Sequence, residues 1–180
     1  MKLNDLSWKN NAAVFLKNNK MNQIKIGDMI PDFSLKDQDG NLFYINNLIG
    51  KKKLVIFFYP QDGSLNCTRE ACYFRDLSDI FEEADAVVIG ISGQSVESHK
   101  EFAENNGLKY TLLSDSKNKV RKLFGVPGRV FGFIPGRVTY VADRSGKVVY
   151  IFDSQTDTQR HVDEALKICL LLKRTDNADF

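Results

Sequence analysis

The chain has 180 residues, of which 43% are hydrophobic and 27% charged, and its formal net charge at pH 7 is +2. This composition is that of an ordinary globular protein, and the small net charge argues against binding to nucleic acid or to a membrane surface. No apolar run approaches the roughly 20 residues that a membrane-spanning helix needs. We therefore predict one domain, long enough to bury a sizeable core.

The start of the chain does not follow the pattern of a secretory signal peptide. Its apolar core is only Ala12–Leu16, and no small-residue cleavage site follows. We therefore predict a cytoplasmic location. Three cysteines are too few for a disulfide scaffold in a chain of this size. In a reducing compartment, a close pair of cysteines is instead typical of a catalytic or metal-binding site.

Residues 1–22 are predicted to be an N-terminal appendage, residues 23–173 a single domain, and residues 174–180 a flexible tail. Within the domain, buried apolar runs, helical periodicity and terminating glycines predict alternating strands and helices. After an initial hairpin, the predicted elements are strand 54–59, helix 67–83, strand 86–92, helix 96–106, strand 110–114, helix 116–124, strands 137–142 and 147–152, and helix 158–173. This order predicts an α/β fold, with a central mixed sheet and helices on both of its faces.

The domain begins with a predicted β-hairpin, in which segments 33–36 and 41–45 flank the sequence Asp37–Gly40. The glycine can adopt the positive φ that a tight turn requires. The same four residues resemble the start of a calcium-binding loop, but the later ligands and the closing glutamate are missing. A turn is therefore the favoured interpretation.

The segment FYPQDGSLNCTREACYFRD, residues 58–76, places Cys67 where a polar loop becomes a helix, and Cys72 lies five residues further on. A thiol at a helix N-terminus faces unpaired N–H groups and the positive end of the helix dipole, which favour the thiolate. Polar neighbours predict that Cys67 lies at the surface, whereas Cys169 lies on an apolar helical stripe and is predicted to be a core residue. A metal site or a C-x-x-C reductase motif fits the spacing poorly.

The spacing of the two cysteines also makes a geometric prediction. On a regular helix, Cα atoms five residues apart are separated by roughly 8.7 Å. A disulfide tolerates a Cα separation of at most about 7 Å. Cys67 and Cys72 therefore cannot bond while the helix is intact, and a bond between them requires the first turn to unwind.

The run from Pro60 to Asp76 reads P-x-D-x-[Ser/Thr]-x-x-C-T-x-E-x-C-x-F-R-D, which resembles the active-site segment of peroxiredoxins. The cysteine spacing is similar to that of the bacterioferritin-comigratory-protein or PrxQ subgroup. The resemblance continues through VIGIS, SHKEFAENNGLKYTLLSD, KVRKLFGVPG and PGRVTYVADRSGKV into HVDEALK, and it covers about residues 24–172. It implies a thioredoxin-like fold and an antioxidant thiol peroxidase of cell redox homeostasis, with no cofactor and no bound metal.

The resemblance also implies a role for individual residues. Cys67 would be the peroxidatic cysteine, which hydrogen peroxide or an organic hydroperoxide oxidises to a sulfenic acid. Cys72 would be the resolving cysteine, forming an intrachain disulfide that thioredoxin or a similar dithiol reduces. Ser64 would hydrogen-bond to the thiol or the peroxide, Arg137 would favour the thiolate and polarise the peroxide, and Pro60 would shield the thiolate.

Three further polar residues have weaker signals. We hypothesise that Glu70, one turn from Cys67, orients Arg137 by an ion pair; the alternative is a solvated first-turn glutamate favoured by the helix dipole. His99 and His161 lie at helix-compatible surface positions away from these motifs, and both are predicted to be structural.

The family usually has Thr-Pro-Gly before the cysteine, where this chain has Ser64-Leu65-Asn66. The exchange keeps the hydroxyl but removes the proline and glycine that shape the loop, so an inactive structural relative stays open as an alternative. A second alternative is a non-enzymatic redox sensor that passes oxidation to a partner protein through the same two cysteines. Because the C-terminus has no second cysteine motif, we favour a monomer over a dimer joined by an intersubunit disulfide.

Overall fold

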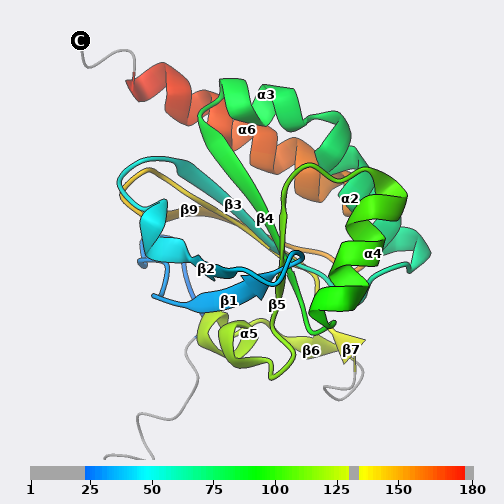
Figure 1. The fold of residues 1–180 in the computed structure, drawn as a ribbon. Coiled ribbons are helices and arrows are strands. Elements are labelled where there is room, and N and C mark those ends of the chain that lie inside the picture. The colour runs from blue at the N-terminus through cyan, green and yellow to red at the C-terminus, as the bar shows by residue number, and fades with distance from the viewer. Residues whose placement is uncertain (1–22, 130–133, 177–180) are drawn as a thin grey trace, which may run out of the picture.

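A computed structural model describes residues 23–129 and 134–176 of the chain (Figure 1). Seven strands form one mixed sheet in the order β2-β1-β5-β4-β3-β8-β9. Their bounds are β1 Ser34–Asp37, β2 Leu42–Tyr44, β3 Lys53–Phe58, β4 Ala86–Ser92, β5 Thr111–Ser114, β8 Val138–Ala142 and β9 Val148–Asp153. Within the described ranges, no helix is long and apolar enough to cross a membrane.

The strand β3 lies in the interior of the sheet, between β4 and β8, and its six residues are all buried. It pairs in parallel with β4 and antiparallel with β8, while β4 pairs in parallel with β5. Alternate side chains of a strand point to opposite faces. Val55 and Phe57 accordingly belong to one hydrophobic cluster, and Ile56 and Phe58 to another. Burial on both faces explains the near-continuous apolar run that the sequence shows here.

Helices cover both faces of the sheet (Figure 1). One face is covered by α2 (Leu65–Asp76), α3 (Ser78–Glu83), α4 (Val96–Asn106) and α6 (Thr158–Asp176). The other is covered by α5 (Lys119–Phe124) and the 3-10 helix η1 (Ile45–Asn47). A separate two-stranded sheet pairs β6 (Gly128–Arg129) with β7 (Ile134–Pro135). The predicted α/β fold, with a mixed sheet between layers of helices, is confirmed.

The predicted N-terminal hairpin is also present, because β1 and β2 pair antiparallel. The Asp37 carboxylate accepts hydrogen bonds from the N–H groups of Asp39 and Asn41 at 2.9 and 2.8 Å. Gly40 has a φ of +83°, which a glycine adopts without strain. The aspartate therefore serves the turn itself, as the favoured interpretation predicts.

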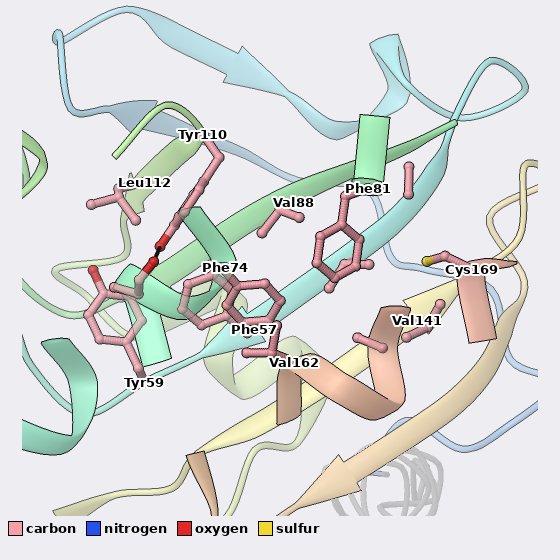
Figure 2. Close-up of a cluster of buried hydrophobic side chains, with 14 of the residues drawn as sticks. Phe57, Tyr59, Phe74, Phe81, Val88, Tyr110, Leu112, Val141, Val162 and Cys169 are labelled. Carbon is pink, nitrogen blue, oxygen red and sulfur yellow. Dashed lines mark hydrogen bonds between the residues drawn. The ribbon is translucent and has the colours of Figure 1, made fainter. Parts of the chain in front are cut away.

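Aromatic residues fill the core between the sheet and the larger group of helices (Figure 2). The rings of Phe57 and Phe74 stack with their centroids 4.5 Å apart, which ties α2 to the central strand. Cys169 lies in this cluster and is fully buried, so its predicted core position is confirmed. Burial raises the pKa of the Cys169 thiol to about 12.

The single helix predicted over residues 67–83 is wrong, since the chain divides there into α2 and α3. Leu77, between them, has φ −103° and ψ 9°, outside the helical range. In a straight helix, residues seven apart are separated by about 10 Å along the axis. The break instead brings the rings of Phe74 and Phe81 to 5.7 Å within one core.

Two helix boundaries differ from the predicted residue by three positions, more than the strand ends do. The helix predicted from residue 116 begins at Lys119, because Asn118 has a positive φ of 52° and the Asp115 carboxylate accepts from Lys119 N–H at 2.7 Å. At the C-terminus, α6 continues to Asp176, so the first part of the predicted tail is helical. The predicted appendage, residues 1–22, lies outside the described residues, as do residues 177–180.

Candidate active site

Cys67 lies in the first turn of α2, as the third residue of the helix. Ser64 caps this turn. Its carbonyl accepts from Thr68 N–H at 2.8 Å, and its Oγ accepts from Cys67 N–H at 3.4 Å. Serine is a preferred cap because its side chain pairs with an N–H group that the helix leaves unpaired. Cys67 therefore lies within the turn where the helix dipole acts.

Cys67 has only 1% of its surface exposed, so the predicted surface position is wrong. Its side chain belongs to the hydrophobic cluster under α2, together with Ala71 and Phe74. These residues follow Cys67 by four and seven positions, which places them on the same face of the helix. The polar neighbours that suggested exposure include Asn66 and Arg69, which are indeed exposed on the outer side. The polarity of the sequence neighbours therefore gave a wrong prediction for Cys67, because adjacent residues of a helix point to different faces.

Arg137 directly precedes β8, and its side chain is almost completely buried. Its Nη2 donates to the Cys67 sulfur at 3.2 Å, and its Nη1 forms an ion pair with the Glu70 carboxylate. One guanidinium can serve both partners because its planar fork presents several N–H donors in a fixed geometry. Glu70 is fully buried, which excludes the alternative of a solvated first-turn glutamate.

Gln155, which follows β9, also contacts Arg137. Its Oε1 accepts from the Arg137 backbone N–H at 3.2 Å, and its carbonyl accepts from the Arg137 Nε at 3.4 Å. Its own Nε2 lies 3.5 Å from the carbonyl of Pro135. Sequence reasoning missed Gln155, because it lies in a polar loop 18 residues from Arg137 and no motif marks it.

The Glu70 carboxylate lies in an unusual electrostatic setting. Burial raises the pKa of Glu70, and the positive charge and hydrogen bond of Arg137 oppose that rise. Its Oε2 pairs with Arg137, while its Oε1 has no hydrogen-bond partner among the residues that the structure describes. A buried carboxylate that is only partly hydrogen-bonded is costly to ionise. The close contact with Arg137 is therefore what allows the charged form.

His161 is fully buried on α6, and its Nδ1 lies 3.8 Å from the Glu70 Oε1, so its predicted surface position away from the motifs is wrong. The Nδ1 lies 2.7 Å from Thr139 Oγ1, and the Nε2 lies 2.8 Å from the Ser154 carbonyl. A carbonyl only accepts, so Nε2 carries the proton and Nδ1 accepts from the Thr139 hydroxyl. Burial lowers the pKa of His161 to about 4, so the ring is neutral at pH 7.

A pocket of about 400 Å³ opens beside this buried group of residues. Three of the predicted site residues, Pro60, Ser64 and Arg137, contribute to its wall together with Gln155. Arg137 therefore lines the pocket and also contacts the Cys67 sulfur. The volume is sufficient for a small hydroperoxide.

Hydrogen bonds to the Asp62 carboxylate hold the loop before α2 in place. This carboxylate accepts from Tyr59 OH at 2.8 Å, from Ser98 Oγ at 2.6 Å and from His99 Nδ1 at 2.9 Å. Burial opposes ionisation of Asp62, but hydrogen bonds from His99, Ser98 and Tyr59 hold its pKa below the ordinary value. His99 is fully buried, so its predicted surface position is wrong as well. Its second nitrogen lies 3.2 Å from the Leu113 carbonyl, which anchors the loop to the sheet.

Cys72 lies further along the same continuous helix and is partly exposed. Its thiol donates to Asn106 Oδ1 at 3.8 Å and accepts from Arg75 Nη1 at 3.6 Å. Both Cys67 and Cys72 are free thiols here. The intact helix and the separate contacts of the two sulfurs agree with the geometric prediction that they do not bond in this conformation.

A buried thiol in the first turn of a helix, held by a guanidinium beside a small pocket on a thioredoxin-like sheet, defines the class of a thiol peroxidase. The chain belongs to the AhpC/TSA family, which it matches over residues 26–151. Within that family it resembles the peroxiredoxin Q and bacterioferritin-comigratory proteins, as the sequence predicts. Its activity is that of a thiol peroxidase that reduces hydroperoxides with thiol reductants.

Relatives of this chain include proteins that are named chloroplastic peroxiredoxin Q. The protein of Sedum lineare is 45% identical over 167 residues, which cover 93% of this chain and 89% of that protein. The protein of Arabidopsis thaliana is 49% identical over 156 residues, covering 87% and 69%. These names give the predicted cytoplasmic location no support.

Solved structures of peroxiredoxins share the fold. Peroxidoxin BcpB from Mycobacterium tuberculosis superposes with a TM-score of 0.76 and 36% identity, covering 85% of this chain and 98% of that protein. Peroxiredoxin Q from Xanthomonas campestris superposes with a TM-score of 0.72 and 27% identity, covering 78% and 91%.

Proposed function

We propose that Cys67 is the peroxidatic cysteine of this thiol peroxidase, and that Cys72 resolves its sulfenic acid by forming an intrachain disulfide. The observation that carries the proposal is the buried contact of Arg137 with both the Cys67 sulfur and the Glu70 carboxylate. A fixed positive charge beside the sulfur favours the thiolate. The remaining N–H groups can stabilise the charge that develops on the leaving oxygen.

In the first step, the Cys67 thiolate attacks one oxygen of the hydroperoxide, and the O–O bond breaks. The sulfur is oxidised to a sulfenic acid, and the other oxygen takes up a proton and leaves as water or an alcohol. Both Ser64 and Pro60 lie in the pocket wall. The Ser64 hydroxyl would hydrogen-bond to the peroxide, and the Pro60 ring would shield the thiolate. Glu70 acts as a positioning residue, because its ion pair fixes the plane of the guanidinium group.

In the second step, the Cys72 thiolate attacks the Cys67 sulfur, the S–O bond breaks, and hydroxide leaves as water once protonated. The two Cα atoms, five residues apart on a helix, are separated by about 8.7 Å. Since a disulfide tolerates about 7 Å, the first turn of α2 must open. A dithiol protein, thioredoxin or a similar one, then reduces the disulfide by thiol–disulfide exchange.

Two further parts of the proposal concern assembly and location. The buried Cys169 thiol is a poor candidate for a bond to a second chain, which supports a monomer. Light scattering before and after oxidation would measure the molecular mass. The cytoplasmic location stays a prediction, and the chloroplastic names of the plant relatives point instead to a plastid. Fractionation of cells that express the native chain would decide between the two.

The proposal is tested by treating reduced protein with one equivalent of hydrogen peroxide, followed by intact mass measurement and a non-reducing peptide map. We expect a loss of two hydrogens that maps to a Cys67–Cys72 link within one chain. The matched controls are Cys72→Ser, which should stop at the sulfenic acid, and Cys169→Ser, which should behave like the native protein. Multiple turnover with a thioredoxin system then distinguishes an enzyme from a redox sensor.

Other products would contradict the proposal. A linked dimer, or a bridge that includes Cys169, would show that the resolving partner is not Cys72. Thiols that react no faster than a free cysteine would show that the Ser64-Leu65-Asn66 loop has lost the chemistry.

A further inference from the structure

Each of the two cysteines on α2 has a guanidinium group of its own. Arg137 contacts the Cys67 sulfur, and Arg75, three residues along the helix from Cys72, places its Nη1 3.6 Å from the Cys72 sulfur. Residues three apart are neighbours on one face of a helix. The second cation is therefore part of the same helical segment as the second cysteine.

The position of Arg75 is fixed by the end of a neighbouring helix. Its Nη1 also donates to the Asn106 carbonyl at 2.5 Å, and Asn106 is the last residue of α4. The last carbonyls of a helix lack partners within it, so they attract cations. Asn106 completes the contact from its side chain, whose Oδ1 accepts from the Cys72 thiol while its Nδ2 donates to the Phe102 carbonyl.

One cationic N–H group, on Arg75, is directed at the Cys72 sulfur. Tyr110, which lies near this site, stays neutral, because burial raises its pKa well above the ordinary value. Asp76 is the acidic residue in contact with Arg75, and it binds Nε and Nη2 rather than the Nη1 that faces the sulfur. The N–H group aimed at Cys72 is therefore shared with a neutral carbonyl and not with a carboxylate.

We propose that Arg75 is a catalytic residue of the resolution step: it stabilises the Cys72 thiolate and, through Asn106, keeps the C-terminal half of α2 docked while the first turn opens. This inference rests on the proposed function, in which Cys72 is the resolving cysteine. The thiolate attacks the Cys67 sulfur, the S–O bond breaks, and the thiol proton of Cys72 ends on the released hydroxide as water. Arg75 does not contact Cys67 and takes no part in peroxide reduction.

The experiment separates the two steps in time. Native protein and the Arg75→Gln variant are mixed with hydrogen peroxide and quenched at intervals, and mass spectrometry counts reduced, sulfenic and disulfide forms. We expect an unchanged rate of sulfenic acid formation and a disulfide rate about tenfold lower, the usual effect of losing one adjacent charge. The slow variant should also accumulate more sulfinic acid at high peroxide, because its sulfenic acid persists.

Two matched variants distinguish charge from structure. Arg69→Gln removes one cation from an exposed position of the same helix, and should resolve at the native rate. Arg75→Lys keeps the charge and should recover part of the rate. A merely structural loss would not be rescued by Arg75→Lys, because only the charge is common to the two side chains.

Three results would overturn the inference. One is a native disulfide rate in Arg75→Gln, and another is an equal slowing of both steps, which would indicate general damage to α2. The third, equal disulfide rates for Arg75→Lys and Arg75→Gln, would remove the charge from the explanation. Failure of the underlying proposed function looks different, because native protein itself would then form no Cys67–Cys72 link.

Discussion

The two ends of α2 differ in how they hold a cysteine. At the N-terminal end, Cys67, Arg137 and Glu70 are all buried, each with at most 1% of its surface exposed. Towards the C-terminal end, Cys72 is partly exposed, and the Arg75 and Asp76 side chains that flank it are 32% and 57% exposed. The first site excludes water around an ion pair, and the second is open to it.

This difference matches the two tasks that we propose. Attack on a peroxide gains from fixed charges in a dry setting, where they act strongly and need no rearrangement. Attack on a sulfenic acid requires one sulfur to travel towards the other, and a partly exposed site allows that motion at lower cost. Changes on the buried side should therefore have large effects on rate and stability, and changes on the open side small effects on stability.

The largest effect is expected from the variant Arg137→Gln, which tests the buried end of α2. Removing one preorganised donor should slow the reaction of Cys67 with peroxide by about 10²- to 10³-fold. It also leaves Glu70 without its partner, which should lower the free energy of unfolding by about 3–5 kcal/mol. Stopped-flow peroxide kinetics and urea unfolding measure the two effects.

Two companion variants separate these effects. The double variant Glu70→Gln/Arg137→Gln should regain most of the stability but none of the rate, because no buried charge remains unpaired. Glu70→Gln alone should slow the peroxide reaction, since Arg137 is less firmly oriented. An unchanged peroxide rate in Glu70→Gln would remove the positioning role of Glu70.

A second test measures how the free energy of unfolding changes at acid pH, where the buried His161 decides the outcome. The pKa of His161 is about 4 in the folded protein, against an ordinary value of 6.5. The unfolded chain therefore binds the proton first, so the stabilisation is complete above pH 6.5 and is lost as the pH falls towards 4. The loss reaches about 3 kcal/mol. Urea unfolding of native protein and His161→Gln between pH 7 and pH 4 should show the native protein losing more; equal losses would contradict the assignment.

Ser64→Ala should have a smaller effect. Loss of the N-cap should lower the free energy of unfolding by about 1 kcal/mol. If the hydroxyl also binds the peroxide, the peroxide reaction should slow by up to about tenfold, the usual effect of losing one hydrogen bond. Ser64→Thr keeps the hydroxyl and should restore both quantities. A native rate in Ser64→Ala would limit Ser64 to the cap.

The smallest effect is expected on the open side, from Asp76→Asn. This change removes an exposed ion pair with Arg75, and such pairs contribute less than about 1 kcal/mol. Thermal or urea unfolding should scarcely change, and the peroxide reaction should keep its native rate. A large destabilisation would mean that the open side is as tightly organised as the buried one.

Much of this protein can be predicted from local sequence. The central strand is a continuous apolar run, α4 ends at Gly107 in the left-handed conformation, and the turn at Gly40 follows its DxDG sequence. These features depend on side chains within a few residues, so periodicity and capping rules suffice. The active-site motif belongs here too, because Ser64 and Cys67 share one helix turn.

The tertiary structure alone decided which of these residues are buried and what surrounds them. Cys67 has polar neighbours in sequence and a hydrophobic cluster in space, and His161 reaches Glu70 only because α6 packs beside α2. Arg137 contacts the Cys67 sulfur across 70 residues of chain. Contacts between distant segments depend on how the whole sheet and its helices pack, so local sequence patterns cannot predict them.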